Sequence, residues 1–185
     1  MDRRDFLRKA TALSVGFLAM VRGGKTWAKG LPSDRPLSRE ELSRLLWATT
    51  GVNREDGHRT TPSGQGKYPV DVLAALPGGV YRYEPKEHRL VRIFPEDIRE
   101  KIPNQDSFKK AAMIVLYVIN KDKASRIEWA DIEIGCMSQD LYLESAALGM
   151  GSCIFAGVKV NDITKILGLK ESQILRIAQA AGPTK

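Results

Sequence analysis

The sequence predicts an α+β fold, in which a mixed and largely antiparallel sheet is covered by helices packed around one long central helix. Two short apolar segments, Val70–Leu76 and Val80–Tyr83, are separated only by Pro77-Gly78-Gly79, which is typical of a hairpin turn. The run Ala112–Ile119 is almost continuously apolar, as expected of a strand buried on both faces. The segment Trp129–Leu148 carries apolar residues near helical spacing, which predicts the central helix.

A first helix is predicted over residues 38–50. Ser38 and Glu41 have the spacing of a capping box, and apolar residues recur on one face after them. The stretch from Gly51 to Tyr68 contains four glycines and too little apolar periodicity for a strand or a long helix. Because loops of this length are uncommon in compact domains unless they are functional, we expect this loop to have a function.

Turn and cap residues divide the rest of the chain into short elements. They are a strand at 88–93, a short helix at 95–101, a strand at 152–157, a helix capped by Asn161 and ending at Gly168, and a strand at 173–181. The sequence shows no internal repeat, and helices and strands are mixed along it. This order supports the α+β class.

Residues 1–28 have the pattern of a twin-arginine export signal, which is read by a receptor and carries folded proteins. Arg3-Arg4 precede Asp5-Phe6-Leu7, and the apolar run from Ala10 to Val21 is shorter than the roughly 20 residues that span a bilayer. Thr26-Trp27-Ala28 is an acceptable cleavage site, which places the mature start near Lys29. The sequence therefore predicts a signal peptide at 1–28, one domain at 29–185 and a periplasmic location.

The charge pattern argues against nucleic-acid binding. Six basic and two acidic residues in the first 28 supply four of the formal net charge of +7, so the mature chain carries only about +3, with its basic residues scattered among acidic ones. Cys136 and Cys153 are the only cysteines. We expect two separate thiols, because one falls in a predicted helix and the other in a predicted strand, although the sequence alone leaves a disulfide open.

Several familiar site patterns are excluded by their context. Gly149-Met150-Gly151 follows a predicted helix and lacks the third glycine of a dinucleotide-binding turn, and Gly66-Lys67 lacks the rest of a phosphate loop. His58 and His88, with two distant cysteines, do not make a zinc site. Ser63 is not part of a nucleophile elbow, so a hydrolase is not indicated.

A set of ordered fragments carries more information than any single motif. The fragments are Leu45-Leu46-Trp47-Ala48, Gly51-Val52-Asn53-Arg54, Arg59-Thr60-Thr61-Pro62-Ser63, Gly79-Val80-Tyr81-Arg82-Tyr83, Ser138-Gln139-Asp140 and Ala147-Leu148-Gly149-Met150-Gly151-Ser152. In this order and spacing they resemble the FMN-dependent nitroreductase family, and within it the branch of SagB-type dehydrogenases, from about Pro36 to Lys185. The resemblance implies a nitroreductase-like fold, bound FMN, oxidoreductase activity on a small-molecule or peptide substrate, and a homodimer with the flavin between two chains.

The resemblance also implies which residues bind the cofactor. Those near the ribityl chain and phosphate are Pro62, Ser63, Gly64 and Gly66, with Arg59 as the nearby cation and Lys185 as a C-terminal one. Those whose backbone N–H groups face the N5 and O4 edge of the flavin ring are Ile154, Phe155, Ala156 and Gly157. Positive charge and backbone N–H groups suit a phosphate. No catalytic side chain and no metal is implied, because the cofactor performs the transfer.

Two departures from the family pattern leave a second hypothesis open. The Arg-Arg-Ser-x-Arg stretch that helps family members hold the phosphate is replaced by Thr26-Trp27-Ala28-Lys29-Gly30, and Gly66 stands where Asn is usual. The alternative is a cofactor-poor binding or interaction module of the same fold. The surroundings of Arg59 and Gly157 distinguish the two, since they should converge on one interfacial cleft if flavin binds and be filled by side chains otherwise. A cofactor acquired in the cytoplasm would explain export of a folded chain by the twin-arginine machinery, and a membrane or cytochrome donor is then expected in place of NAD(P)H.

Overall fold

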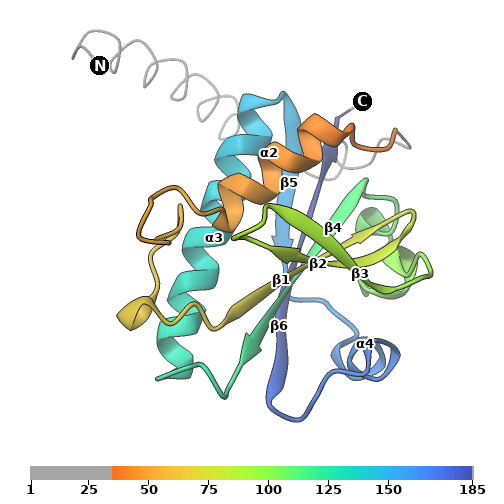
Figure 1. The fold of residues 1–185 in the computed structure, drawn as a ribbon. Coiled ribbons are helices and arrows are strands. Elements are labelled where there is room, and N and C mark those ends of the chain that lie inside the picture. Colours follow the sequence, from red (N-terminus) through yellow and green to blue (C-terminus); the bar gives the residue numbers. More distant parts are fainter. Residues whose placement is uncertain (1–34, 185) are drawn as a thin grey trace, which may run out of the picture.

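A six-stranded sheet organises residues 35–184, the part of the chain that the computed structural model describes (Figure 1). The strand order is β3-β2-β1-β4-β6-β5, and every neighbouring pair is antiparallel. The strands are β1 (Val70–Leu76), β2 (Gly79–Glu84), β3 (Arg89–Phe94), β4 (Met113–Asn120), β5 (Met150–Phe155) and β6 (Gln173–Pro183). With three helices packed on this sheet, the predicted α+β class is confirmed.

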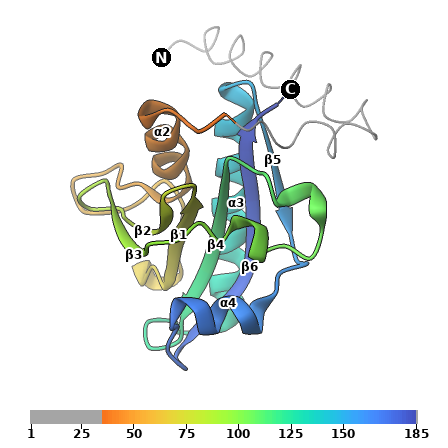
Figure 2. The ribbon, with the colours of Figure 1, turned by 90° about the vertical axis from the view of Figure 1, so that its right-hand side faces the viewer.

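The helices cover both faces of the sheet. Helix α2 (Arg39–Thr50) and the long helix α3 (Ile127–Ala147) pack on one face, whereas α4 (Val160–Leu167) lies on the other (Figure 2). Ser38 caps α2 as predicted, because its hydroxyl accepts from Glu41 N–H while the Glu41 carboxylate accepts from Ser38 N–H. The predicted central helix is therefore present and forms the middle of one layer.

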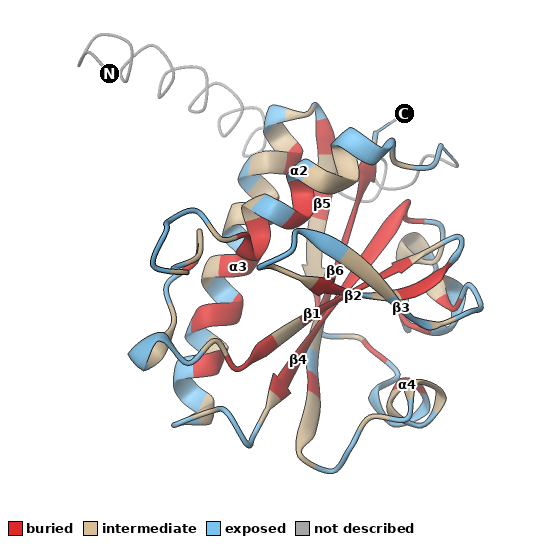
Figure 3. Ribbon diagram, viewed as in Figure 1, coloured by how far each residue is buried: buried red, intermediate tan, exposed pale blue. Residues whose placement is uncertain are grey.

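Strand β4 joins the two halves of the core, which Figure 3 shows as a band of buried residues through the sheet. Its side chains alternate between the two faces. Tyr117 belongs to the cluster under α2 and α3, and its neighbours Leu116 and Val118 belong to the cluster under α4. This explains why the sequence of β4 is apolar at almost every position, as predicted for a strand buried on both faces.

The hairpin between β1 and β2 depends on glycine. Gly79 has φ +124°, a backbone conformation that residues with a side chain rarely adopt. A Cβ atom at this position would collide with the carbonyl oxygen of Phe94 on β3. The close approach of β3 to the start of β2 therefore requires glycine, which agrees with the predicted Pro77-Gly78-Gly79 turn.

A buried polar network ties α3 to three strands. The Tyr117 hydroxyl donates to Oε1 of Gln179 over 2.8 Å, and Nε2 of Gln179 donates to Ser152 Oγ over 2.9 Å and to the carbonyl oxygen of Ser138 over 3.2 Å. Gln179 itself is fully buried. All three bonds meet at one amide, so the network fixes the position of α3 relative to β4, β5 and β6.

Replacement of Gln179 by leucine is expected to lower the free energy of unfolding by about 2 kcal/mol, because Tyr117 and Ser138 would lose a buried partner. Urea unfolding followed by circular dichroism measures this change. Gln173→Leu, at the partly exposed start of the same strand, is the matched control and should change stability much less. Equal stability of Gln179→Leu and the unsubstituted chain would contradict a stabilising role for the network.

Some predicted boundaries are wrong. The short helix at 95–101 is only a 3₁₀ turn at Arg99–Lys101, because the Asp97 carboxylate accepts from Arg99 N–H and holds the chain in a turn. Helix α4 begins at Val160, so Asn161 lies inside it and does not cap it, whereas the end at Gly168 is confirmed by a left-handed C-cap with φ 59°. Strand β5 begins at Met150 and ends at Phe155, which leaves Ala156 and Gly157 beyond it.

Other predictions concern the ends of the chain and the cysteines. The signal peptide at 1–28 and the cation Lys185 lie outside the described residues. Within residues 35–184, no helix is both long enough and apolar enough to cross a membrane. Cys136 in α3 and Cys153 in β5 are free thiols.

Candidate functional site

The first group of predicted site residues lies in a loop, residues 59–68, that packs against α3 (Figure 1). The buried Thr61 hydroxyl is 2.8 Å from the carbonyl oxygen of Thr49 in α2 and 2.9 Å from Asp140 in α3. Gly64 lies so close to Trp129 that a Cβ atom built on it would be 2.8 Å from the indole ring. The 59–68 loop is therefore fixed between the two helices.

Hydrogen bonds inside the 59–68 loop close it into a compact turn. The hydroxyl of Ser63 accepts from Tyr68 N–H over 2.8 Å, and the hydroxyl of Tyr68 accepts from Arg59 N–H over 3.2 Å. Gln65, Gly66 and Tyr68 all have positive φ angles, of 58°, 63° and 46°. For the two residues with side chains this backbone is strained, and such strain is concentrated at binding sites.

The Arg59 side chain is only partly satisfied within the described residues. Its guanidinium lies 4.3 Å from the centre of the Tyr68 ring, a cation–π contact, and makes a single hydrogen bond, to Thr50 Oγ1 over 3.3 Å. Burial lowers the pKa of Arg59, while Glu133 is the largest influence that raises it. Arg59 is partly exposed, so several N–H donors remain available to a ligand that carries negative charge.

Glu133 of α3 faces the same loop and was not expected from the sequence. It is 2% exposed, and neither carboxylate oxygen makes a hydrogen bond of normal geometry within the described residues. Burial raises its pKa to about 7, although the Ser63 hydroxyl and the Arg59 charge act in the opposite direction. The signal that could have revealed it is a charged residue placed directly between two isoleucines, Ile132 and Ile134.

The second group of predicted residues lies at the end of β5. The N–H of Ile154 already donates to the Tyr142 hydroxyl over 2.8 Å, and the ring of Phe155 is stacked on Phe108 with 4.5 Å between centres. Beyond the strand, Ala156 is exposed and Gly157 partly exposed, and their N–H groups have no hydrogen bond within residues 35–184. These two N–H groups are the ones best placed to donate to a ligand.

The two groups lie on opposite sides of α3. Successive residues of a helix are 100° apart, so Glu133 and Asp140, which face the 59–68 loop, share one side, whereas Tyr142, which contacts β5, is about 160° to 180° away from them. Figure 1 shows the loop and β5 on either side of this helix. Within one chain, Arg59 and Gly157 therefore do not converge on a single cleft.

Between these two sides, α3 exposes apolar residues. Trp129 is 37% exposed, Ile132 66% and Leu143 44%, and Cys136 and Gln139 continue the same line. By helical spacing these five residues form one narrow surface, which we call the α3 stripe. The stripe is bordered by the 59–68 loop on one side and by β5 on the other.

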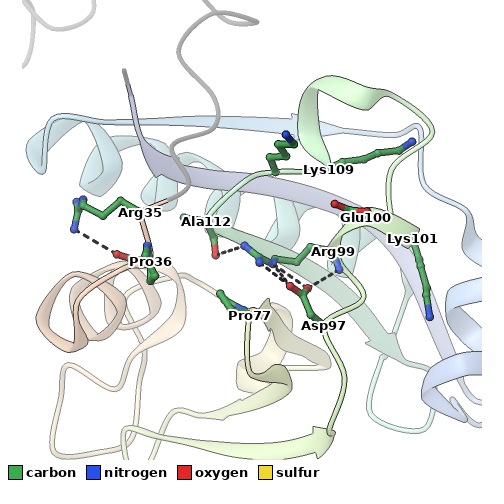
Figure 4. A pocket seen from close by; sticks show the side chains of 10 residues that line it. Arg35, Pro36, Pro77, Asp97, Arg99, Glu100, Lys101, Lys109 and Ala112 are labelled. Carbon is green, nitrogen blue, oxygen red and sulfur yellow. Dashed lines mark hydrogen bonds and ion pairs between the residues drawn. The ribbon is translucent and has the colours of Figure 1, made fainter.

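A separate basic hollow of about 390 Å³ contains none of the predicted residues (Figure 4). Its lining includes Arg35, Arg99, Lys101, Lys109 and Lys110. The Arg99 guanidinium is already bound, because it pairs with Asp97 over 2.6 Å and donates to the carbonyl oxygens of Ala111 and Ala112. Lys109 is paired with Asp106 over 2.6 Å. Arg35 pairs with Glu41 over 2.7 Å and Lys101 with Glu96 over 4.0 Å, so four of the five cations have a carboxylate partner within the chain.

The residues described so far fit a flavin phosphate and ring edge better than a metal ion. Within residues 35–184, no group of three or more His, Cys, Asp or Glu side chains could hold a metal. Arg59 offers unfilled N–H donors, and Ala156 and Gly157 offer unfilled backbone N–H groups. These are donors for negative charge, which is the chemistry that a phosphate and a reduced flavin ring require.

The model of the nitroreductase family matches residues 33–182. This chain belongs to the nitroreductase family. The match covers the six strands and three helices described above, except for Pro183, the last residue of β6. Membership of the nitroreductase family supports an oxidoreductase.

Individual members of the family agree with this assignment. The candidate nitroreductase MJ1384 of Methanocaldococcus jannaschii is 29% identical over 156 residues, covering 76% of this chain and 79% of that protein. The structure of a candidate nitroreductase from Ralstonia eutropha JMP134 has a TM-score of 0.80 and 30% identity, covering 88% and 82% of the two chains. A candidate nitroreductase from Desulfovibrio desulfuricans, solved in complex with FMN, has a TM-score of 0.62 and 18% identity, covering 90% and 85%. The nitroreductase fold is thus shown for this chain.

Proposed function

We propose that the protein is an FMN-dependent oxidoreductase of the SagB-type branch, exported folded to the periplasm and active as a homodimer on a small-molecule or peptide substrate. The observation that carries this proposal is the separation of the two donor groups. Arg59 lies on one side of the α3 stripe, and Ala156 and Gly157 lie on the other. One chain supplies two incomplete halves of a site.

A second copy packed on the α3 stripe would complete the site. If the two copies are related by a two-fold axis running roughly along α3, the β5 side of one copy lies over the 59–68 loop of the other. Each interface would then contain two equivalent sites, each with Arg59 from one chain and Gly157 from its partner. Burial of the exposed Trp129, Ile132 and Leu143 side chains supplies the apolar driving force.

The chain's own residues then have separate roles. Arg59 would donate to the FMN phosphate, and the compact 59–68 loop would hold Pro62, Ser63, Gly64 and Gly66 around the ribityl chain. The N–H groups of Ala156 and Gly157 would donate to the N5 and O4 edge of the ring, with Ile154 and Phe155 positioning them. Bound FMN supplies hydride or electron transfer, so no side chain has to act as acid or base.

A twin-arginine signal and a flavin support one another, because a cofactor acquired in the cytoplasm needs a folded pocket before export. A periplasmic location places the enzyme away from NAD(P)H, so the donor in this proposal is a membrane or cytochrome component. We expect NADH oxidation by the purified flavoprotein to be slow. Rapid, saturable turnover followed at 340 nm would contradict this donor assignment.

Loss of flavin from an Arg59 variant tests the function directly. Protein co-expressed with an intact twin-arginine export system should show visible flavin absorption, and Arg59→Ala should lose it. Arg54→Ala is the matched control, since Arg54 is an exposed cation four residues after the end of α2 and lies in the same connection between α2 and β1. A featureless spectrum that stays featureless after dialysis against FMN would overturn the proposal.

One observation favours the alternative of a cofactor-poor binding module. Tyr142 already occupies the N–H of Ile154, and Phe108 covers one face of Phe155, so part of the second group is filled by the chain's own side chains. Under this alternative, neither Arg59→Ala nor Arg54→Ala changes the spectrum, because no flavin is bound. The absorption experiment therefore separates the two functions.

A further inference from the structure

Glu133 of α3 and Arg59 of the 59–68 loop carry opposite charges. They face one another where the loop packs on the helix, but they do not form an ion pair. Each influences the pKa of the other, but no contact within 4.0 Å joins them. Glu133 has no hydrogen bond of normal geometry within the described residues, and Arg59 has one long bond. Both charged groups therefore keep unused hydrogen-bonding capacity where water is largely excluded. This costs free energy unless a ligand or a proton satisfies them.

The two side chains differ in accessibility. Arg59 is partly exposed and can be reached by a ligand, whereas Glu133 is 2% exposed and cannot. An anion bound to Arg59 would oppose a negative charge on Glu133 through a medium of low dielectric constant. Within residues 35–184 no cation lies in contact with the buried carboxylate, so proton uptake is the way in which it can relieve this repulsion.

We propose that Arg59 and Glu133 form a proton-coupled anion site, in which Glu133 takes up one proton from solvent when a dianion binds to Arg59. The balance is simple: the carboxylate, the free dianion and one solvent proton become a neutral carboxylic acid beside the bound dianion. No bond other than the O–H bond of Glu133 forms, and no electron is transferred. In this role Glu133 acts on the bound dianion through its charge and does not touch the ligand.

The polar and titratable groups around Arg59 and Glu133 do not include a second carboxylate that lacks both a nearby cation other than Arg59 and a hydrogen-bond donor. They come from every element packed against it: Ser63 and Tyr68 from the loop, Asp71 from β1, Tyr83 from β2 and Asp140 from α3 itself. Asp71 and Asp140 also have raised pKa values through burial, but Asp71 is influenced by Lys123 and Arg82, and Asp140 is held by Thr61. Burial raises the pKa of Tyr83 to about 12, so its hydroxyl stays neutral.

The dianion that we test is FMN, so the inference rests on the proposed function, and sulfate serves as an independent probe. Calorimetric titration of the full chain, freed of flavin by dialysis, in two buffers of different ionisation enthalpy at pH 7.5 gives the number of protons taken up. The FMN phosphate is already a dianion at this pH because its second pKa is about 6. With a Glu133 pKa of about 7, roughly three-quarters of a proton should be taken up per FMN bound.

Variants assign this proton to Glu133. Glu133→Gln, which keeps the size of the side chain, should bind FMN with almost no proton uptake, whereas Asp140→Asn should take up as many protons as the unsubstituted chain. Riboflavin, which lacks the phosphate, should give almost none with any of them. Equal proton uptake by Glu133→Gln and the unsubstituted chain, or by riboflavin and FMN, would overturn the inference.

The two probes separate the failure of this inference from the failure of the proposed function. FMN binding without proton uptake leaves the flavin function standing and rejects the proton-coupled pair. Sulfate binding with proton uptake, in a chain that does not bind FMN, supports the pair and rejects the flavin function. Absence of binding by both probes rejects both.

Discussion

A chain with Leu143 replaced by aspartate is expected to be monomeric and to lose its flavin together with its partner. Leu143 is 44% exposed in the α3 stripe, so a single chain tolerates the change, but a carboxylate there would be buried between two copies. Burying an unpaired charge is highly unfavourable, and we expect dimerisation to weaken by at least about 100-fold, or about 3 kcal/mol. Sedimentation velocity with absorption detected at 280 and 450 nm measures the size and the flavin content together.

A surface substitution of the same kind on another element is the control. Ile93 of β3 is 39% exposed, and this strand forms the opposite edge of the sheet from β5. Ile93→Asp should therefore remain dimeric and keep its flavin. The proposed interface fails if Leu143→Asp stays a dimer, and the shared site fails if the monomeric variant retains flavin, because one chain would then be sufficient.

The parts of the fold that the sequence predicted well are those set by neighbouring residues. The capping box at Ser38 joins residues three positions apart, and the turn at Gly79 depends on the positive φ of that glycine itself; both are present. The doubly buried strand β4 is equally clear, because burial on both faces leaves almost no polar residue in its sequence. Local chemistry of this kind needs no knowledge of the rest of the fold.

The boundaries that were wrong depend on distant or competing contacts. Asn161 has the chemistry of an N-cap, but the chain enters α4 two residues earlier through Lys159, whose N–H donates to Ile102 on another segment. Strand β5 ends at Phe155, and after it the carbonyl oxygen of Gly157 accepts from Asn104 and is drawn away from the sheet. Neither contact is visible in the sequence around these residues.

The candidate site likewise combines features that the sequence predicts with features that depend on distant contacts. The resemblance placed Arg59 and Gly157 in one site, but the sequence could not show that α3 separates them within a chain, because this depends on which sides of a helix face the loop and β5. Glu133 also escaped prediction, since a single glutamate on a helix is ordinarily exposed. Its significance appears only when burial and the absence of a hydrogen-bond partner within the described residues are known.

Glu133→Gln is expected to make the flavin-free protein more stable at pH 8 by up to about 3 kcal/mol. The pKa of Glu133 is raised from 4.5 to about 7 in the folded chain, so between these values the folded state binds more protons than the unfolded state. The free energy of unfolding therefore falls as the pH rises from about 4.5 through about 7, and glutamine, which does not titrate, removes this loss. Urea unfolding at pH 5, 6.5 and 8 measures the difference.

The pH dependence distinguishes this cause from a general effect of removing a charge. At pH 5 Glu133 is protonated in the folded chain, and this pH is only about half a unit above the pKa of the unfolded chain, so the stability difference should be below about 1 kcal/mol there and should grow as the pH rises to 8. Glu128→Gln is the control, because Glu128 lies on the same helix and is exposed; it should follow the unsubstituted protein at every pH. A constant offset of Glu133→Gln from pH 5 to 8 would show that the two side chains differ in packing or hydrogen bonding, and that the buried carboxyl does not titrate in this range.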